Sequence, residues 1–87
     1  MEPIKIILHK QAEKYFNRLD SGTKERIKEG IKGLTENPPA GNIKELKGEF
    51  QGLKRLQIGK LRIIYAADGN LIKITNILPR GDVYKRI

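Results

Sequence analysis

Two turn sequences divide the second half of the chain into three apolar runs, each about as long as a β-strand. Gly59-Lys60 suits a two-residue turn with glycine first, and Asp68-Gly69-Asn70 supplies residues that tolerate a positive φ. Connections this short join antiparallel neighbours. The pattern therefore predicts an antiparallel meander with strands at about Leu53–Ile58, Leu61–Ala67 and Leu71–Leu78.

The first half of the chain predicts one strand and two helices. Residues 4–8 form a short β-rich run, and from about Lys10 to Leu19 the apolar residues recur at helical spacing. Capping oxygens at residues 20–22 precede a second amphipathic stripe, from about Thr23 to Glu36. The order β-α-α-β-β-β places the chain in the α+β class, with a helical hairpin packed on one face of a small, mainly antiparallel sheet.

Length and composition limit the alternatives. At 87 residues we expect one domain, residues 1–87, in which residues 40–52 form a loop of low order. Cysteine is absent, which excludes disulfides, thiolate metal sites and a cysteine nucleophile. The longest uncharged apolar run, residues 63–67, is too short for a membrane span, and residues 1–5 do not resemble a signal peptide. We therefore expect a cytoplasmic protein without a membrane partner.

Positive charge is concentrated in the half that forms the meander. The net charge is +8, from 18 basic and 10 acidic residues. Residues 1–42 carry eight Lys/Arg against six Asp/Glu, whereas residues 43–87 carry ten against four. Such an excess favours a polyanion, because each neutralised phosphate releases condensed counterions. A surface that merely keeps a small protein in solution would also be lysine-rich, so composition alone leaves both interpretations open.

The predicted hairpin places basic residues side by side. If Gly59 and Lys60 are the two turn residues, Gln57 lies opposite Arg62, and Arg55 lies opposite Ile64. One face then carries the apolar residues that pack against the helices, and the other carries Arg55 and Arg62 as diagonal neighbours. Lys73 joins that second face if the next turn has two or four residues. Grouped cations of this kind favour anion binding, although long side chains that extend into water give the same pattern.

Three motifs carry a family resemblance. They are Leu46-Lys47-Gly48, the strand Gly59-Lys60-Leu61-Arg62-Ile63-Ile64-Tyr65 preceded by Arg55, and Pro79-Arg80-Gly81-Asp82-Val83-Tyr84. With them, essentially the whole chain resembles the RelE/ParE toxin superfamily. RelE-like members cut mRNA in the ribosomal A site and are held inactive by a cognate antitoxin. ParE-like members have the same fold and inhibit DNA gyrase by binding.

The resemblance implies roles for particular residues. Arg62 and Arg80 would stabilise the phosphate in the transition state, Tyr84 would position the nucleotide, and Arg55 or Lys54 would aid proton transfer or phosphate binding. Five further basic residues of this half would bind RNA: Lys47, Lys60, Lys73, Lys85 and Arg86. The sequence departs at three places from residues that are common in the family: Gln57, Lys60-Leu61 and Pro79. These departures leave the general base unassigned.

Other candidates are weaker. His9 is the only imidazole, but it lies far in sequence from the basic face and suits a surface or capping position. Glu49 is a minor candidate for the base, since an acid near Lys47 and Lys54 more often forms a local ion pair. The sequence shows no cluster of metal ligands, so we expect neither a metal nor another cofactor.

These observations predict a RelE-like toxin. It would be a metal-independent, ribosome-dependent endoribonuclease in which the ribose 2′-hydroxyl attacks the adjacent phosphodiester. Its partners would be the ribosome, mRNA and a RelB-like antitoxin with an acidic amphipathic segment that covers either the basic face or the helical hairpin. The alternatives are a ParE-like gyrase inhibitor and a non-catalytic or decayed RNA-binding member of the fold.

Overall fold

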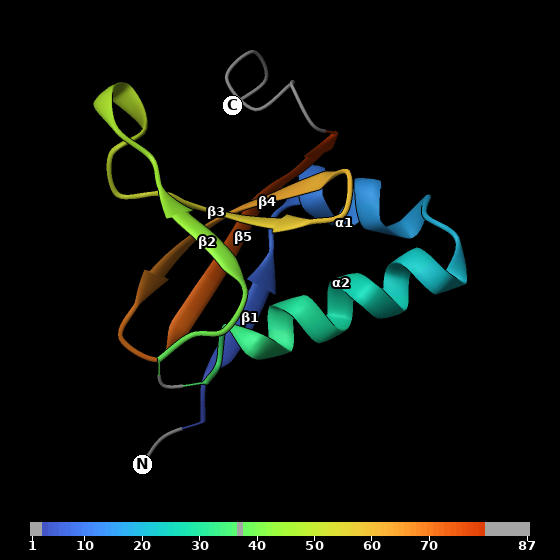
Figure 1. The fold of residues 1–87 in the computed structure, drawn as a ribbon, viewed down its shortest axis with the longest axis horizontal. Coiled ribbons are helices and arrows are strands. Elements are labelled where there is room, and N and C mark those ends of the chain that lie inside the picture. Colours follow the sequence, from blue (N-terminus) through green and yellow to red (C-terminus); the bar gives the residue numbers. More distant parts are fainter. Residues whose placement is uncertain (1–2, 37, 80–87) are drawn as a thin grey trace.

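A computed structural model describes residues 3–36 and 38–79. Both helices pack against the same side of one sheet (Figure 1). This arrangement confirms the expected α+β fold with a helical hairpin on one face of a mainly antiparallel sheet. The elements follow in the order β1 (Lys5–Leu8), α1 (Lys10–Asn17), α2 (Ser21–Gly33), β2 (Asn42–Glu45), the 3-10 helix η1 (Gly48–Phe50), β3 (Lys54–Ile58), β4 (Leu61–Asp68) and β5 (Leu71–Pro79).

The described strands form a mixed sheet in the order β1-β5-β4-β3-β2. β1 runs parallel to β5, and the other neighbouring pairs are antiparallel. Because β1 and β2 lie at opposite edges, the helical hairpin carries the chain across one whole face before the meander returns strand by strand to β1 (Figure 1). Neither α1 nor α2 covers the opposite face of the sheet, and we call it the helix-free face.

Residues 40–52 are more ordered than the sequence predicts. The expectation of a loop of low order is wrong for residues 42–45, which form β2 along the edge of β3, and for residues 48–50, which form η1. β2 contains a single apolar residue, Ile43, which packs against the main core. One apolar residue between polar neighbours gives too little alternation to reveal a strand. The strand exists because β3 offers it a hydrogen-bonding edge.

An aspartate sets the start of α2. The Asp20 carboxylate accepts hydrogen bonds from the Thr23 hydroxyl at 2.7 Å and from the Thr23 backbone N–H at 3.0 Å. These hydrogen bonds hold the pKa of Asp20 below its usual value, with the side-chain bond as the larger cause. As the N-cap, Asp20 starts the helix at Ser21, two residues before the predicted start.

The register of the meander agrees with the prediction. Gly59 and Gly69 have φ of 57° and 60° and begin two-residue turns, of which the first has the length that the sequence predicts. Gln57 lies opposite Arg62 and Arg55 opposite Ile64, which confirms the predicted pairing. Apolar residues of β3, β4 and β5 on the helix side form the core with α1 and α2: Ala12, Ile27, Ile31, Leu34, Leu56, Ile63, Tyr65, Ile72, Ile74 and Ile77.

A β-bulge adjusts β5 to this core. Ile64 pairs with Asn76 but Tyr65 pairs with Ile74, so Thr75 is the extra residue. The Thr75 hydroxyl donates to the Ile64 carbonyl oxygen at 3.2 Å. The shift moves Ile77 onto the core side. Tyr65 on the opposing strand is buried in the same core, and this burial raises the pKa of its hydroxyl.

A side chain of α1 completes the outer edge of β5. β1 reaches only as far as Ile74, so the next outward-facing backbone groups of β5, those of Ile77, have no strand beside them. The Gln11 amide takes that place: it donates to the Ile77 carbonyl oxygen at 3.1 Å and accepts from the Ile77 N–H at 3.0 Å. Neither α1 nor α2 is long and apolar enough to cross a membrane, within the part of the chain that the structure describes.

Candidate functional site

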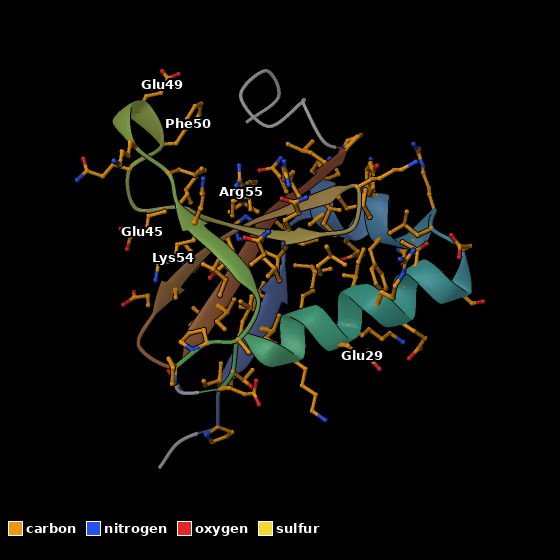
Figure 2. The ribbon with its side chains drawn as sticks, viewed as in Figure 1. Glu29, Glu45, Glu49, Phe50, Lys54 and Arg55 are labelled. Atoms are coloured by element: carbon orange, nitrogen blue, oxygen red, sulfur yellow. The ribbon has the colours of Figure 1, made fainter. Side chains whose placement is uncertain are left out.

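The helix-free face carries the basic pair that the sequence predicts. Arg55 on β3 and Arg62 on β4 belong to neighbouring cross-strand pairs, with Ile64 opposite Arg55 and Gln57 opposite Arg62. Diagonal neighbours of this kind have Cα atoms about 7–8 Å apart, within reach of two arginine side chains. Both side chains are half-buried. Figure 2 shows Arg55 in the middle of the sheet, away from both helices.

A second, small apolar cluster lies beside Arg55 on the same face. Leu46 and Ile64 are buried on the helix-free face, and Phe50 and Leu53 pack against them. Arg55 is the cross-strand partner of Ile64, so its side chain leaves the sheet beside this cluster. The Arg55 Nε atom is shielded from water and has no hydrogen-bond partner among the described residues. A buried donor without an acceptor costs free energy, which an incoming anion would recover.

Lys54 and Lys73 occupy different places from Arg55. Lys54 pairs with Tyr65 and therefore lies on the helix side, with Glu45 of β2 as its other cross-strand neighbour (Figure 2). Lys73 lies on the helix-free face, as expected for a two-residue turn, but it pairs with Ala66, four residues along β4 from Arg62. That separation is about 13 Å along the strand. The structure therefore brings Arg62, and neither lysine, next to Arg55.

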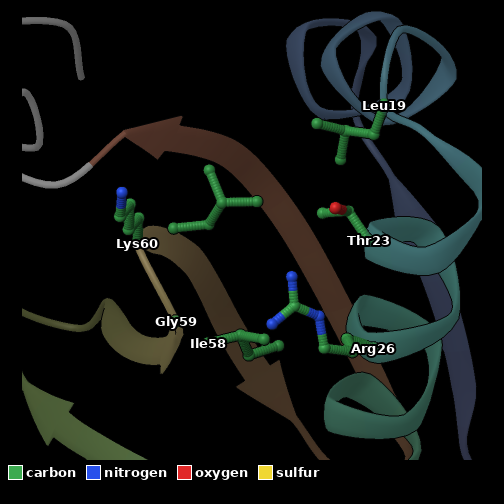
Figure 3. A pocket seen from close by; sticks show the side chains of 7 residues that line it. Leu19, Thr23, Arg26, Ile58, Gly59 and Lys60 are labelled. Atoms are coloured by element: carbon green, nitrogen blue, oxygen red, sulfur yellow. The ribbon is translucent and has the colours of Figure 1, made fainter.

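Lys47 and Lys60 are both exposed. Lys47 directly precedes η1, at the end of β3 away from the Gly59-Lys60 turn. Lys60 lies in the β3–β4 turn, beside a cavity of about 530 Å³ between that turn and α2. Figure 3 shows the guanidinium of Arg26 in this cavity. Lys60 therefore lies at the end of the helix-free face and also lines a cavity on the helix side.

The C-terminal candidates lie outside the described residues. These are Arg80, Tyr84, Lys85 and Arg86, and their roles remain predictions. The described part of β5 leads toward them: Leu78 lies opposite Arg62, and Pro79 lies opposite Leu61. β5 therefore ends beside Arg62, one peptide bond before Arg80.

Among the described residues, no acid forms an ion pair with Arg55. Between described residues, the ion pair that appears joins Lys28 and Glu25 at 3.6 Å on α2. Glu49 lies at the tip of the η1 loop and is exposed (Figure 2). His9 is the exposed N-cap residue of α1, in keeping with a surface position. Residues 3–36 and 38–79 contain no group of three or more acidic, histidine or cysteine side chains placed to hold a metal ion.

Sequence reasoning missed two side chains. Lys44 lies in β2 directly opposite Arg55, but the residues around it were expected to form a loop. Gln11 holds the end of β5 from α1, 66 residues away in sequence. The only sequence signal for Lys44 is its position beside Ile43, and nothing in the local sequence distinguishes Gln11 from a solvent-facing helix residue.

Comparisons with known proteins agree on the fold. The archaeal RelE in its complex with RelB from Pyrococcus horikoshii OT3 superposes with a TM-score of 0.76 at 27% identity, over 92% of this chain and 98% of that one. YoeB in the YoeB-YefM complex from Staphylococcus aureus superposes with a TM-score of 0.72 at 25% identity, over 87% of this chain and 95% of that one. A chain of the toxin-antitoxin complex RelBE2 from Mycobacterium tuberculosis superposes with a TM-score of 0.74 at 20% identity, over 91% of this chain and 100% of that one. This likeness supports the fold alone.

The class of protein follows from these findings: the chain has the fold of the RelE/ParE toxin superfamily, as its motifs predict. The sequence profile described as "ParE toxin of type II toxin-antitoxin system, parDE" matches residues 6–84. The chain belongs to this ParE toxin family. A search of curated proteins found no match to this chain.

Proposed function

We propose that this toxin is a ribosome-dependent endoribonuclease that cleaves mRNA in the A site. The observation that supports this proposal most is the pairing of Arg55 and Arg62 on the helix-free face. Guanidinium groups bind phosphate oxygens bidentately and remain charged at any relevant pH. The similarity to RelE and YoeB at 25–27% identity is consistent with it.

The proposed cleavage requires few protein groups beyond the basic residues of the helix-free face. The ribose 2′-hydroxyl is the nucleophile and is already part of the RNA, so the protein must align it and stabilise the additional negative charge of the transition state. Arg62 performs the second task together with Arg80, the residue that follows β5 in the sequence. Arg55 binds a phosphate oxygen through its unsatisfied Nε donor.

The direct test is translation of a defined mRNA with the purified toxin, followed by toe-print mapping. We expect cuts confined to the codon in the A site and no cleavage of the same mRNA without ribosomes. An intact mRNA in both reactions would contradict the proposal.

We predict that metal chelation leaves cleavage unaffected, because the proposed mechanism assigns charge stabilisation to arginine side chains. The measurement compares cleavage of mRNA on programmed ribosomes after the toxin alone has been treated with EDTA and returned to magnesium-containing buffer. An activity lost on treatment and restored by one particular transition metal would overturn this mechanism.

A second candidate function is inhibition of DNA gyrase by binding. The observation that favours it is the match to the ParE family profile over residues 6–84. A supercoiling assay with purified gyrase separates the two candidates. Inhibited supercoiling together with uncut mRNA would establish the ParE-like activity instead.

The partner that we propose is an antitoxin with an acidic, amphipathic segment. The solved relatives include toxins in complex with RelB and YefM antitoxins. Of the two surfaces expected from the sequence, the helical hairpin offers the better site: an apolar groove of about 370 Å³ lies between the helices and β1, with Lys28 and Lys32 of α2 at its border. Apolar residues of the partner would fill the groove and its acids would approach the lysines.

We predict that Lys28→Glu combined with Lys32→Glu weakens the complex at least about tenfold, because two attractive charge pairs become repulsive. Arg55→Glu on the helix-free face serves as the matched control and should leave the affinity almost unchanged. The measurement is titration of each purified toxin variant with the co-encoded antitoxin. If Arg55→Glu alone weakened the complex, the antitoxin would have to bind on the helix-free face instead.

A further inference from the structure

Lys44 extends the arginine pair across a third strand. In the β2–β3 ladder, Lys44 lies directly opposite Arg55. Opposed residues of antiparallel strands place their side chains on the same face, with Cβ atoms about 4.5–5.5 Å apart. Arg62 lies on the other side of Arg55, on β4. Arg55 is therefore flanked by a cation on each neighbouring strand.

This arrangement destabilises the sheet edge when no anion is present. Like charges directly opposite each other disfavour strand pairing. The nearest acid in β2, Glu45, lies opposite Lys54 and hence on the helix side (Figure 2). No ion pair of Lys44 or Arg55 appears between described residues. β2 is only four residues long and contributes only Ile43 to the main core, so it has little other stabilisation.

We propose that Lys44 and Arg55 together bind a backbone phosphate of RNA next to the scissile one. This inference rests on the proposed ribonuclease function and adds a residue to its site. Lys44, Arg55 and Arg62 follow one another on β2, β3 and β4, so an RNA strand that crosses the sheet meets them in sequence. Arg62 acts at the scissile phosphate, and Lys44 holds the strand in place one phosphate away. The orphaned Arg55 Nε donor gains an acceptor in the same step.

The experiment compares Lys44→Glu and Lys44→Gln with the parent toxin. Lys5→Glu is the matched control, because Lys5 lies on the same face but in β1, at the edge of the sheet opposite β2. Thermal unfolding is measured with and without inorganic phosphate at constant ionic strength. Binding of a short single-stranded RNA is measured over a range of salt concentrations, without ribosomes.

We expect Lys44→Glu to unfold at a higher temperature than the parent in the absence of phosphate, because a glutamate opposite Arg55 replaces repulsion with attraction. The same variant should lose the stabilisation that phosphate gives the parent. Its RNA affinity should fall about tenfold, and the slope of log affinity against log salt should decrease by about 0.7, because the variant neutralises one phosphate fewer. Lys44→Gln should show intermediate effects, and Lys5→Glu should keep the parent's response to phosphate.

Two results would overturn the inference. One is a Lys44→Glu variant that keeps the parent's RNA affinity and salt slope. The other is an equal loss of affinity and slope in Lys5→Glu, which would show that any cation on this face acts through its charge alone. The proposed function fails separately: if the parent leaves mRNA uncut on ribosomes while phosphate binding depends on Lys44, the phosphate site stands and the ribonuclease assignment falls.

Discussion

Arg62→Ala should reduce cleavage of mRNA on programmed ribosomes by about a hundredfold or more, while the protein stays folded. Arg62 projects from the middle of the sheet onto the helix-free face, so its removal opens no cavity in the main core. If it stabilises the charge that develops on the scissile phosphate, its loss raises the barrier by about 2.7 kcal/mol or more. Arg62→Lys should recover only part of the rate, because lysine keeps the charge but loses the bidentate fork.

The measurement is single-turnover cleavage beside thermal unfolding of each variant. Lys5→Ala is the control for charge, since it removes a cation from the same face in β1, at the edge of the sheet opposite β2. Arg80→Ala should behave as Arg62→Ala does if both side chains bind the scissile phosphate. The assigned site is wrong if Arg62→Ala and Arg80→Ala both remain folded and cleave at the parent's rate.

The part of this site that the sequence predicts depends on local rules. Gly59 and Gly69 determine two-residue turns, and a two-residue turn determines which residues oppose each other in the hairpin. Arg55 and Arg62 could therefore be placed on one face from the sequence alone. Side-chain alternation is strict within such a hairpin, so this prediction needs no knowledge of the rest of the fold.

The part that the sequence does not predict depends on contacts between distant segments. β2 forms because β3 has a free edge, and this pairing alone brings Lys44 opposite Arg55. The bulge at Thr75 likewise follows from the need to bury Ile77 on the same side as Ile74, which breaks the alternation of β5. Neither feature has a local signature, because in each case a tertiary contact determines the local backbone.

Gln11→Met should lower the free energy of unfolding by about 2–4 kcal/mol, although methionine has a similar size and a good helix propensity. The Gln11 amide is the partner of both outward-facing backbone groups of Ile77, a residue that is 0% exposed. Methionine satisfies neither group, so a buried N–H and a buried C=O lose their hydrogen bonds together. For a domain of this size, the melting temperature should fall by roughly 10–25 °C.

A comparison with Gln11→Glu separates the hydrogen bonds from packing. An ionised glutamate still accepts from the Ile77 N–H, but it has no proton for the Ile77 carbonyl and repels it. Protonation restores one donor and one acceptor, so the folded state should raise the pKa of this carboxyl. Its contribution to stability is then fully present below about pH 4.3, the pKa in the unfolded chain, and is lost as the pH rises through the higher folded value. Relative to the parent, Gln11→Glu should therefore regain stability on acidification, whereas Gln11→Met should not. Thermal unfolding of all three proteins between about pH 4 and 7 tests this, and parallel pH profiles for the two variants would show that Gln11 acts through packing alone.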